Sequence, residues 1–99
     1  MDNIEREPIR YLDVLEELYD VTGGERSASL EEIYRNYTDY PNEKEMHLFR
    51  VHLYKSSRKR SALVKIEKDP NNYRCRLYSL TRSGIARVEW FLANRSQSE

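Results

Sequence analysis

The sequence predicts an α+β domain with three helices, a two-stranded β-hairpin and a C-terminal helix. Three observations support this. Apolar residues recur at helical spacing near both ends of the chain and in its middle. A run rich in β-branched residues is followed by turn residues and a second extended run. The 99 residues also suit one small domain. We therefore expect a single domain over residues 1–99, with frayed ends at residues 1–7 and 95–99.

The first helix is expected to open at Pro8, because the first helical turn tolerates a missing N–H group. The apolar stripe that follows consists of Leu12, Leu15 and Tyr19, widened by Tyr11 and Leu18. Gly23-Gly24 ends this helix, because glycine accepts left-handed backbone angles.

A second, short helix is expected to begin after Ser29. Ser29 and Glu32 form the pattern of a capping box, in which the serine hydroxyl accepts from a backbone amide and the glutamate reaches back. Its buried residues are expected to be Leu30, Ile33 and either Tyr34 or Tyr37. Turn residues at 38–42 separate it from a third helix.

The third helix is expected to run from Glu43 to Lys55, or as far as Arg58. Its inner face is expected to hold Phe49, Leu53, Leu48 and either His52 or Met46. The opposite face then carries His47, Arg50, Tyr54 and Arg58, flanked by Lys44, Val51 and Lys55.

A β-hairpin is predicted next. Leu63–Glu67 has the composition of a strand, residues 69–72 are turn residues, and Tyr73–Leu80 is the returning strand. Thr81 is a suitable N-cap for the last helix. The apolar stripe of that helix is Ile85, Val88 and Leu92, with Phe91 beside it.

The net charge of zero conceals a strong asymmetry. Residues 1–49 contain thirteen acidic and five basic residues, a net charge of −8, and residues 50–99 contain four acidic and twelve basic residues, a net charge of +8. Such asymmetry indicates nucleic-acid or membrane binding, or two solvated faces within one domain. No run of residues is long and apolar enough to span a membrane, and Met1–Arg10 lacks the pattern of a signal peptide.

The hairpin and the start of the last helix resemble those of winged helix-turn-helix regulators of the MarR and PadR kind. The residues that carry the resemblance are Leu63–Ile66, Asp69–Asn72 and Arg76–Gly84, which includes Tyr78-x-Leu80-Thr81-x-x-Gly84. The order of elements extends the resemblance over nearly the whole chain. It implies that Tyr78 and Leu80 turn into the core and that Gly84 allows close packing of the last helix.

The resemblance implies sequence-specific binding of double-stranded DNA, with transcription regulation as the role. The third helix would enter the major groove, and the hairpin wing would lie on the adjacent backbone or minor groove. Arg50 suits a guanine edge, and Tyr54 a phosphate or a thymine methyl group. The candidate DNA-binding residues are Lys44, His47, Arg50, Tyr54, Lys55, Arg58, Lys59, Arg60, Lys68, Asn71, Asn72, Arg74 and Arg76. Glu43 and Glu45 either favour the positive end of the helix dipole or accept from a cytosine amino group.

Specific binding by one such unit implies a second copy, because one unit covers one half-site. We expect a homodimer through the first and last helices, with Val14, Leu18 and Trp90 in its interface. The alternative is that the terminal helices pack together within one domain and bury Trp90.

Other chemistry has little support in the sequence. His47, His52 and Cys75 lack the spacing of metal ligands, and no phosphate-binding loop or nucleophile motif occurs, so we expect neither an enzyme nor a cofactor. Cys75 is expected to be a small buried hydrophobic residue rather than a redox sensor. A single cysteine forms no intramolecular disulfide, which fits the cytoplasm. The alternative function is a winged-helix module that binds another protein.

Overall fold

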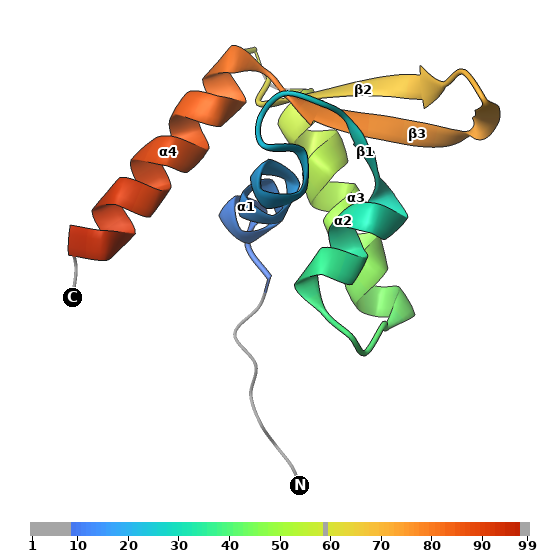
Figure 1. Ribbon diagram of the computed structural model, residues 1–99, viewed down its shortest axis with the longest axis horizontal. Helices are drawn as coiled ribbons and strands as arrows, with labels where there is room; N and C mark the ends of the chain where they lie inside the picture. Colours follow the sequence, from blue (N-terminus) through green and yellow to red (C-terminus); the bar gives the residue numbers. More distant parts are fainter. Residues whose placement is uncertain (1–8, 59, 98–99) are drawn as a thin grey trace, which may run out of the picture.

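The computed structural model describes residues 9–58 and 60–97, with backbone only at residues 96 and 97. These residues form four helices and a three-stranded antiparallel sheet, which confirms the α+β class. The β2–β3 hairpin projects from one side of the helices and α4 lies on the other (Figure 1). In chain order the elements are α1 (Tyr11–Thr22), β1 (Ala28–Ser29), α2 (Leu30–Tyr37), α3 (Glu43–Ser57), β2 (Val64–Asp69), β3 (Asn72–Leu80) and α4 (Arg82–Gln97).

Helix α1 begins at Tyr11, later than the predicted start at Pro8, which lies outside the described residues. Arg10 has extended backbone angles, and its N–H donates to the Asp13 carboxylate at 3.0 Å, which caps the helix at this point. The predicted end is confirmed. Gly23 adopts a φ of 66°, and its N–H donates to the Tyr19 carbonyl oxygen at 2.8 Å.

The buried side of α1 is wider than the stripe predicted for it. Val14 and Leu18 are 0% exposed in the hydrophobic core, because α1 contacts α2, α3, α4 and β3. Leu12 and Tyr19, expected in the buried stripe, are only half-buried. The placement of Val14 and Leu18 in a dimer interface is therefore wrong, since neither side chain reaches the surface of the protomer.

Helix α2 has the predicted cap, since the Ser29 hydroxyl accepts from the Glu32 amide at 3.1 Å. The Glu32 carboxylate forms an ion pair with Arg26 at 2.6 Å and so stabilises the loop before the helix. Immediately before the helix, Ala28 pairs with Tyr78 of β3 and adds a strand that the sequence did not predict. The sheet order is β1-β3-β2, so the predicted two-stranded sheet is corrected to three strands. A two-residue strand is too short to show a period of two.

The predicted hairpin is present as an antiparallel pair of strands. Val64 of β2 lies opposite Leu80 of β3, and the pairing shifts at Lys68/Asp69, beside the turn. The Asp69 carboxylate accepts from the Asn71 amide at 2.9 Å, which stabilises the turn. At the base of the hairpin β3 enters the core, where Tyr78 is 5% exposed and Leu80 is 9% exposed.

The junction between β3 and α4 is tightly packed. The Thr81 hydroxyl accepts from the Gly84 amide at 3.0 Å and donates to the Ala62 carbonyl oxygen at 2.6 Å, which confirms its role as a cap. A Cβ atom at Gly84 would lie 2.0 Å from the Leu63 carbonyl oxygen. The close packing that the resemblance implied at Gly84 is therefore present.

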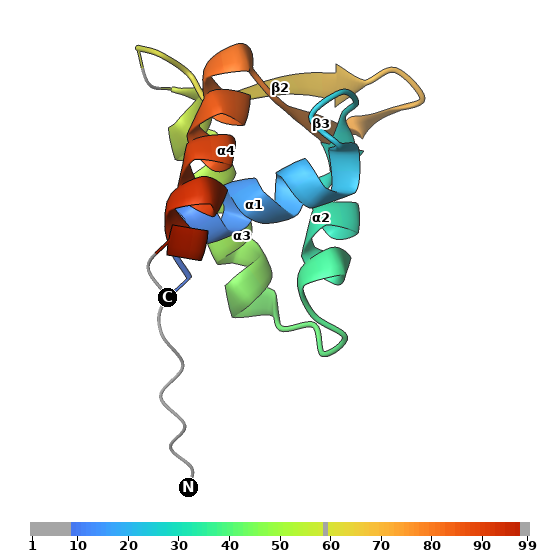
Figure 2. The ribbon, with the colours of Figure 1, turned by 60° about the vertical axis from the view of Figure 1, so that its left-hand side comes forward.

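Helix α4 crosses one end of α1 (Figure 2). Polar contacts join the two helices. The Tyr19 hydroxyl donates to Glu89 at 3.1 Å, and Arg95 donates twice to the Glu16 carboxylate, at 3.0 and 2.9 Å. The helix continues through residues 95–97, which were expected to be frayed. Trp90 is 61% exposed, so packing within the protomer does not bury it. Among the described helices, none has the length and apolar character needed to cross a membrane.

Candidate nucleic-acid interface

Helix α3 is anchored to the core by one face and by its first turn. Phe49 and Leu53 are fully buried. The Asn42 side-chain oxygen accepts from the amides of Lys44 at 2.8 Å and Glu45 at 3.2 Å. This cap satisfies two of the amides that a helix leaves free at its start. The opposite face of α3 is thereby held outward in a defined orientation.

A buried tyrosine on α2 fixes the turn before α3. The Tyr34 hydroxyl accepts from the Asn42 amide at 2.8 Å and donates to the Glu45 carboxylate at 2.9 Å. Burial, reinforced by the hydrogen bond to Glu45, raises the pKa of Tyr34. Glu45 is therefore engaged within the protein, and of the two acidic residues considered for contact with a cytosine, Glu43 is the exposed one.

The predicted inner face of α3 needs one correction. Leu48 is 41% exposed and lies outside the core. Helix α3 contacts the core through Phe49 and Leu53 instead, which are both 0% exposed. Met46 and His52 are both half-buried at its edges. The Nε2 atom of His52 lies 3.0 Å from the carbonyl oxygen of residue 9.

The outer face of α3 carries the predicted polar residues. His47, Arg50, Tyr54 and Arg58 are all exposed, as is the flanking Lys55. Arg58 donates to the Tyr54 hydroxyl at 2.9 Å, and its guanidinium carbon lies 5.5 Å from the centre of the Tyr54 ring. These two side chains therefore stabilise each other one helical turn apart.

The hairpin carries a second group of exposed polar residues. Its predicted candidates Lys68, Asn71, Asn72, Arg74 and Arg76 are all exposed. The Asn72 side-chain oxygen accepts from the Arg74 amide at 3.2 Å and shapes the tip of the hairpin.

Tyr73, close to the hairpin tip, was missed as a candidate and is 73% exposed. The sequence identified it only as the first residue of the returning strand. Its exposure follows from the projection of the hairpin away from the helices (Figure 1).

Cys75 differs from expectation, because it is exposed rather than buried. It lies between Arg74 and Arg76 on β3, in the hairpin that projects from the helices (Figure 1). Within the described residues there is no cluster of three or more His, Cys, Asp or Glu that could hold a metal ion.

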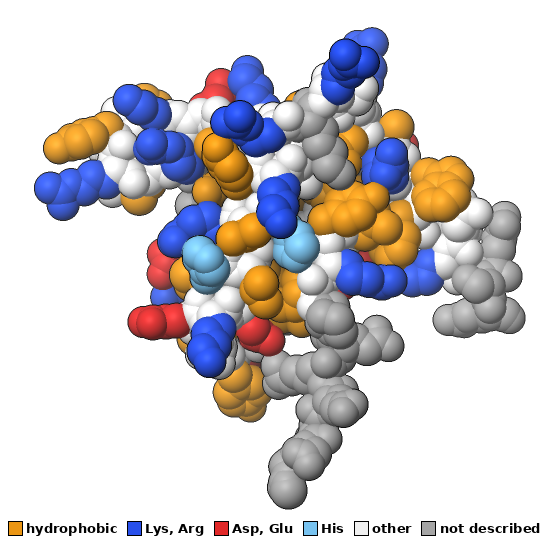
Figure 3. All heavy atoms as spheres, turned by 180° about the vertical axis from the view of Figure 1, so that it is seen from behind, with side chains coloured by type: hydrophobic (Ala, Val, Ile, Leu, Met, Phe, Trp, Pro, Cys, Tyr) orange, Lys and Arg blue, Asp and Glu red, His pale blue; other side chains and the backbone are white. Residues whose placement is uncertain are grey.

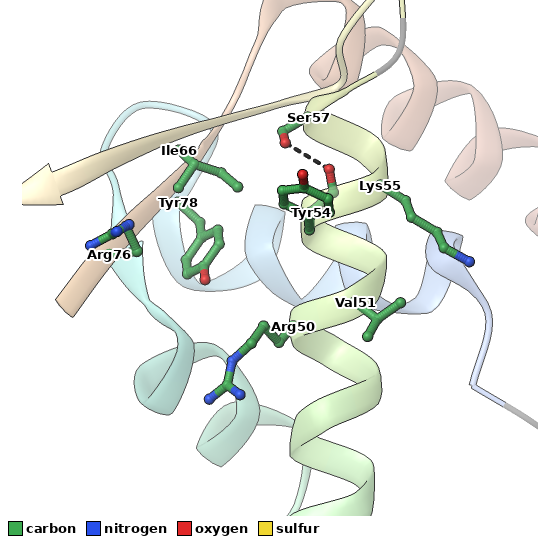
Figure 4. A pocket seen from close by; sticks show the side chains of 8 residues that line it. All are labelled: Arg50, Val51, Tyr54, Lys55, Ser57, Ile66, Arg76 and Tyr78. Carbon is green, nitrogen blue, oxygen red and sulfur yellow. Dashed lines mark hydrogen bonds between the residues drawn. The ribbon is translucent and has the colours of Figure 1, made fainter. Parts of the chain in front are cut away.

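A hollow of about 630 Å³ lies between α3 and the hairpin. Its apolar wall is formed by Val51, Ile66 and the rings of Tyr54 and Tyr78. Arg50 and Arg76 stand on either side of Tyr78, whose hydroxyl points into the hollow (Figure 4). Sequence reasoning missed Tyr78 as a functional residue because the resemblance noted from the sequence implied a core side chain there.

The candidate residues from α3 and the hairpin form one basic face. Seen from behind the view of Figure 1, Lys and Arg side chains cover the hairpin and follow α3, with apolar side chains between them (Figure 3). Arg60, beyond the end of α3, is also exposed, and Lys59 lies outside the described residues. The arrangement presents hydrogen-bond donors and positive charge to one side, as binding of a polyanion requires.

Comparison with known proteins identifies a similar fold. Neither protein-family profiles nor curated proteins match the sequence. Among solved structures, a similar chain is that of Bordetella bronchiseptica BpsR, described in terms of the regulation of its DNA binding by 6-hydroxynicotinic acid. The TM-score is 0.60 at 19% sequence identity, and the match covers 85% of this chain and 58% of that chain. The chain thus spans less than two thirds of the BpsR chain, and the similarity concerns the fold.

Proposed function

We propose that this protein is a winged-helix transcription regulator that binds double-stranded DNA sequence-specifically. Helix α3 enters the major groove, and the β2–β3 wing lies on the adjacent backbone or minor groove. The observation that carries the proposal is the unpaired basic face. Within the described residues, no carboxylate pairs with Arg50, Lys55, Arg58, Lys68, Arg74 or Arg76.

The dimensions of α3 fit this role. Its 15 residues give a length of about 22 Å, and a helix of this kind fits the major groove. Arg50 and Tyr54 lie at the middle of its exposed face, where base edges are within reach. Lys55 and Arg58 lie nearer the end of the helix and suit phosphates. The fold similarity to BpsR, whose DNA binding is described, supports the same assignment.

A homodimer completes the proposal, because two units read two half-sites of one operator. Trp90 is the remaining candidate for its interface. It lies on the outward face of α4 between Ala86 and Ala93, which are also exposed. Small residues on both sides of an exposed indole allow a second helix to approach closely.

Selection of binding sites from random duplexes with the purified protein tests this function. We expect one enriched motif in two copies and a linear fall of log affinity with log salt. About six phosphate contacts per protomer correspond to a slope of about −5 per protomer. Failure to enrich any duplex would refute DNA binding and favour the alternative of a protein-binding module.

The contribution of the wing is tested by replacing Lys68 and Arg74 with alanine. Their loss is expected to weaken binding to all duplexes similarly and to make the salt slope shallower by about two. Arg35→Ala is the matched control, because Arg35 lies on α2 and pairs with Glu31 at 2.9 Å. An unchanged slope in the double variant would remove the wing from the DNA contact.

A further inference from the structure

Tyr78 combines burial with a hydroxyl that has no hydrogen-bond partner in the described part of the chain. Its side chain is 5% exposed, and the hydroxyl points into the hollow between α3 and the hairpin (Figure 4). The other buried tyrosine, Tyr34, has its hydroxyl bonded to Asn42 and Glu45. Since buried hydroxyl groups are almost always paired, the Tyr78 hydroxyl is available as a donor for a bound group.

The groups around this hydroxyl favour an anion. Arg50 and Arg76 line the same hollow as Tyr78. Burial raises the pKa of Tyr78, and the positive charges of the two arginines act in the opposite direction. Arg76 donates to a backbone carbonyl oxygen at 3.4 Å, a long bond that leaves its other N–H groups available. The Tyr78 hydroxyl and the two arginines therefore line one hollow as hydrogen-bond donors.

The remainder of the hollow is apolar. Val51 of α3 and Ile66 of β2 face it, together with the ring of Tyr54. An occupant must therefore carry an anionic group for Tyr78 and Arg76 and a mainly apolar part beside it. A phosphate joined to a deoxyribose has this composition, because the sugar exposes C–H groups next to its phosphate.

We propose that Tyr78 and Arg76 bind one phosphate of the DNA backbone, whose deoxyribose packs on Val51 and Ile66. The proposal rests on the function proposed above and names a contact within it. The bound phosphate sets the position of α3 in the groove, so that Arg50, beside the hollow, points toward the base edges. The positive charge continues past the hollow along α3 and the hairpin, which matches a polyanion better than one small anion (Figure 3).

The test pairs Tyr78→Phe with duplexes that carry one uncharged methylphosphonate, moved along each strand of the selected site. Tyr78→Phe keeps the ring and its packing and removes only the donor. On the unmodified duplex we expect about a ten- to hundredfold loss of affinity, as for one hydrogen bond to a charged group. The salt slope stays unchanged, because no cation is lost. Tyr19→Phe, which removes a hydroxyl on α1 bonded to Glu89, is the matched control and is expected to bind normally.

The decisive result is that the effects of Tyr78→Phe and of the methylphosphonate on affinity are coupled at one position of the duplex. At the bound phosphate, the methylphosphonate should weaken the wild type and remove the difference between the wild type and Tyr78→Phe. Arg76→Gln should couple to the same position and reduce the salt slope by about one. If Tyr78→Phe binds like the wild type, or loses the same factor on every duplex, the phosphate contact is overturned while DNA binding stands. If the wild type binds no duplex, both proposals fail.

Discussion

The junction between the hairpin and α4 yields a prediction whose size follows from the structure. Replacing Gly84 with alanine places a Cβ atom 2.0 Å from the Leu63 carbonyl oxygen, where ordinary contact begins at 3.4 Å. The two segments must separate by about 1.4 Å to restore that contact. The same oxygen accepts from the Thr81 amide at 3.1 Å, so separation also breaks this hydrogen bond.

The expected cost combines overpacking with a lost backbone hydrogen bond, about 3 kcal/mol in total. Gly23→Ala is the matched control. No atom of the described residues lies within 4 Å of a Cβ atom there, and the cost comes from the left-handed φ of 66°, about 1 kcal/mol. For a domain of this size these values correspond to melting temperatures lowered by about 15 °C and about 5 °C.

Urea and thermal denaturation of the two variants, followed by circular dichroism, provide the measurement. The reasoning requires Gly84→Ala to be the more destabilised by a clear margin. A Gly84→Ala variant as stable as Gly23→Ala would mean that the junction opens at little cost. The tight contact would then not hold α4 on the domain.

Three further predictions concern the surface. Replacing Arg50 and Tyr54 with alanine is expected to abolish sequence preference in duplex selection and to leave weak non-specific binding, because the face of α3 reads the bases; a surviving preference would place the reading elsewhere. Trp90→Glu is expected to give monomers in sedimentation velocity without altering the melting temperature, and a dimer of this variant would exclude α4 as the interface. Burial raises the pKa of Glu17, against the opposing hydrogen bond from Asn36, so the folded state favours the protonated form and loses stability as the pH rises through the folded pKa. Glu17→Gln should therefore raise the urea midpoint at about pH 7 and leave it unchanged near about pH 3, and an equal effect at both pH values would contradict this origin.

Much of the architecture could be predicted because it depends on local chemistry. Ser29, Gly23 and Thr81 act within a few residues of their own positions, so their capping roles are readable from the sequence. The presence of the hairpin likewise follows from turn residues and strand composition. The strand β1 was missed because two residues carry no period, and its partner Tyr78 lies far along the chain.

The candidate site likewise contains residues that the sequence could predict and residues that it could not. The exposed face of α3 follows from helical spacing, so its polar residues could be predicted. Cys75 and Tyr73 could not, because their exposure depends on how far the hairpin projects beyond the helices. The hollow with Tyr78 at its centre depends on the distance between α3 and the hairpin, which no local pattern encodes.

The sequence by itself determined the order of helices and strands, their caps and the separation of acidic from basic residues. Periodicity and capping act over a few residues, and charge is a matter of composition. The tertiary structure decided which side chains remain at the surface. Packing from several sides buries Val14 and Leu18, whereas Trp90 is left exposed because nothing in the described chain covers the outer face of α4. Packing also places the Tyr78 hydroxyl in a hollow with two arginines and with no hydrogen-bond partner among the described residues, because the chain brings β3 and α3 together only on folding.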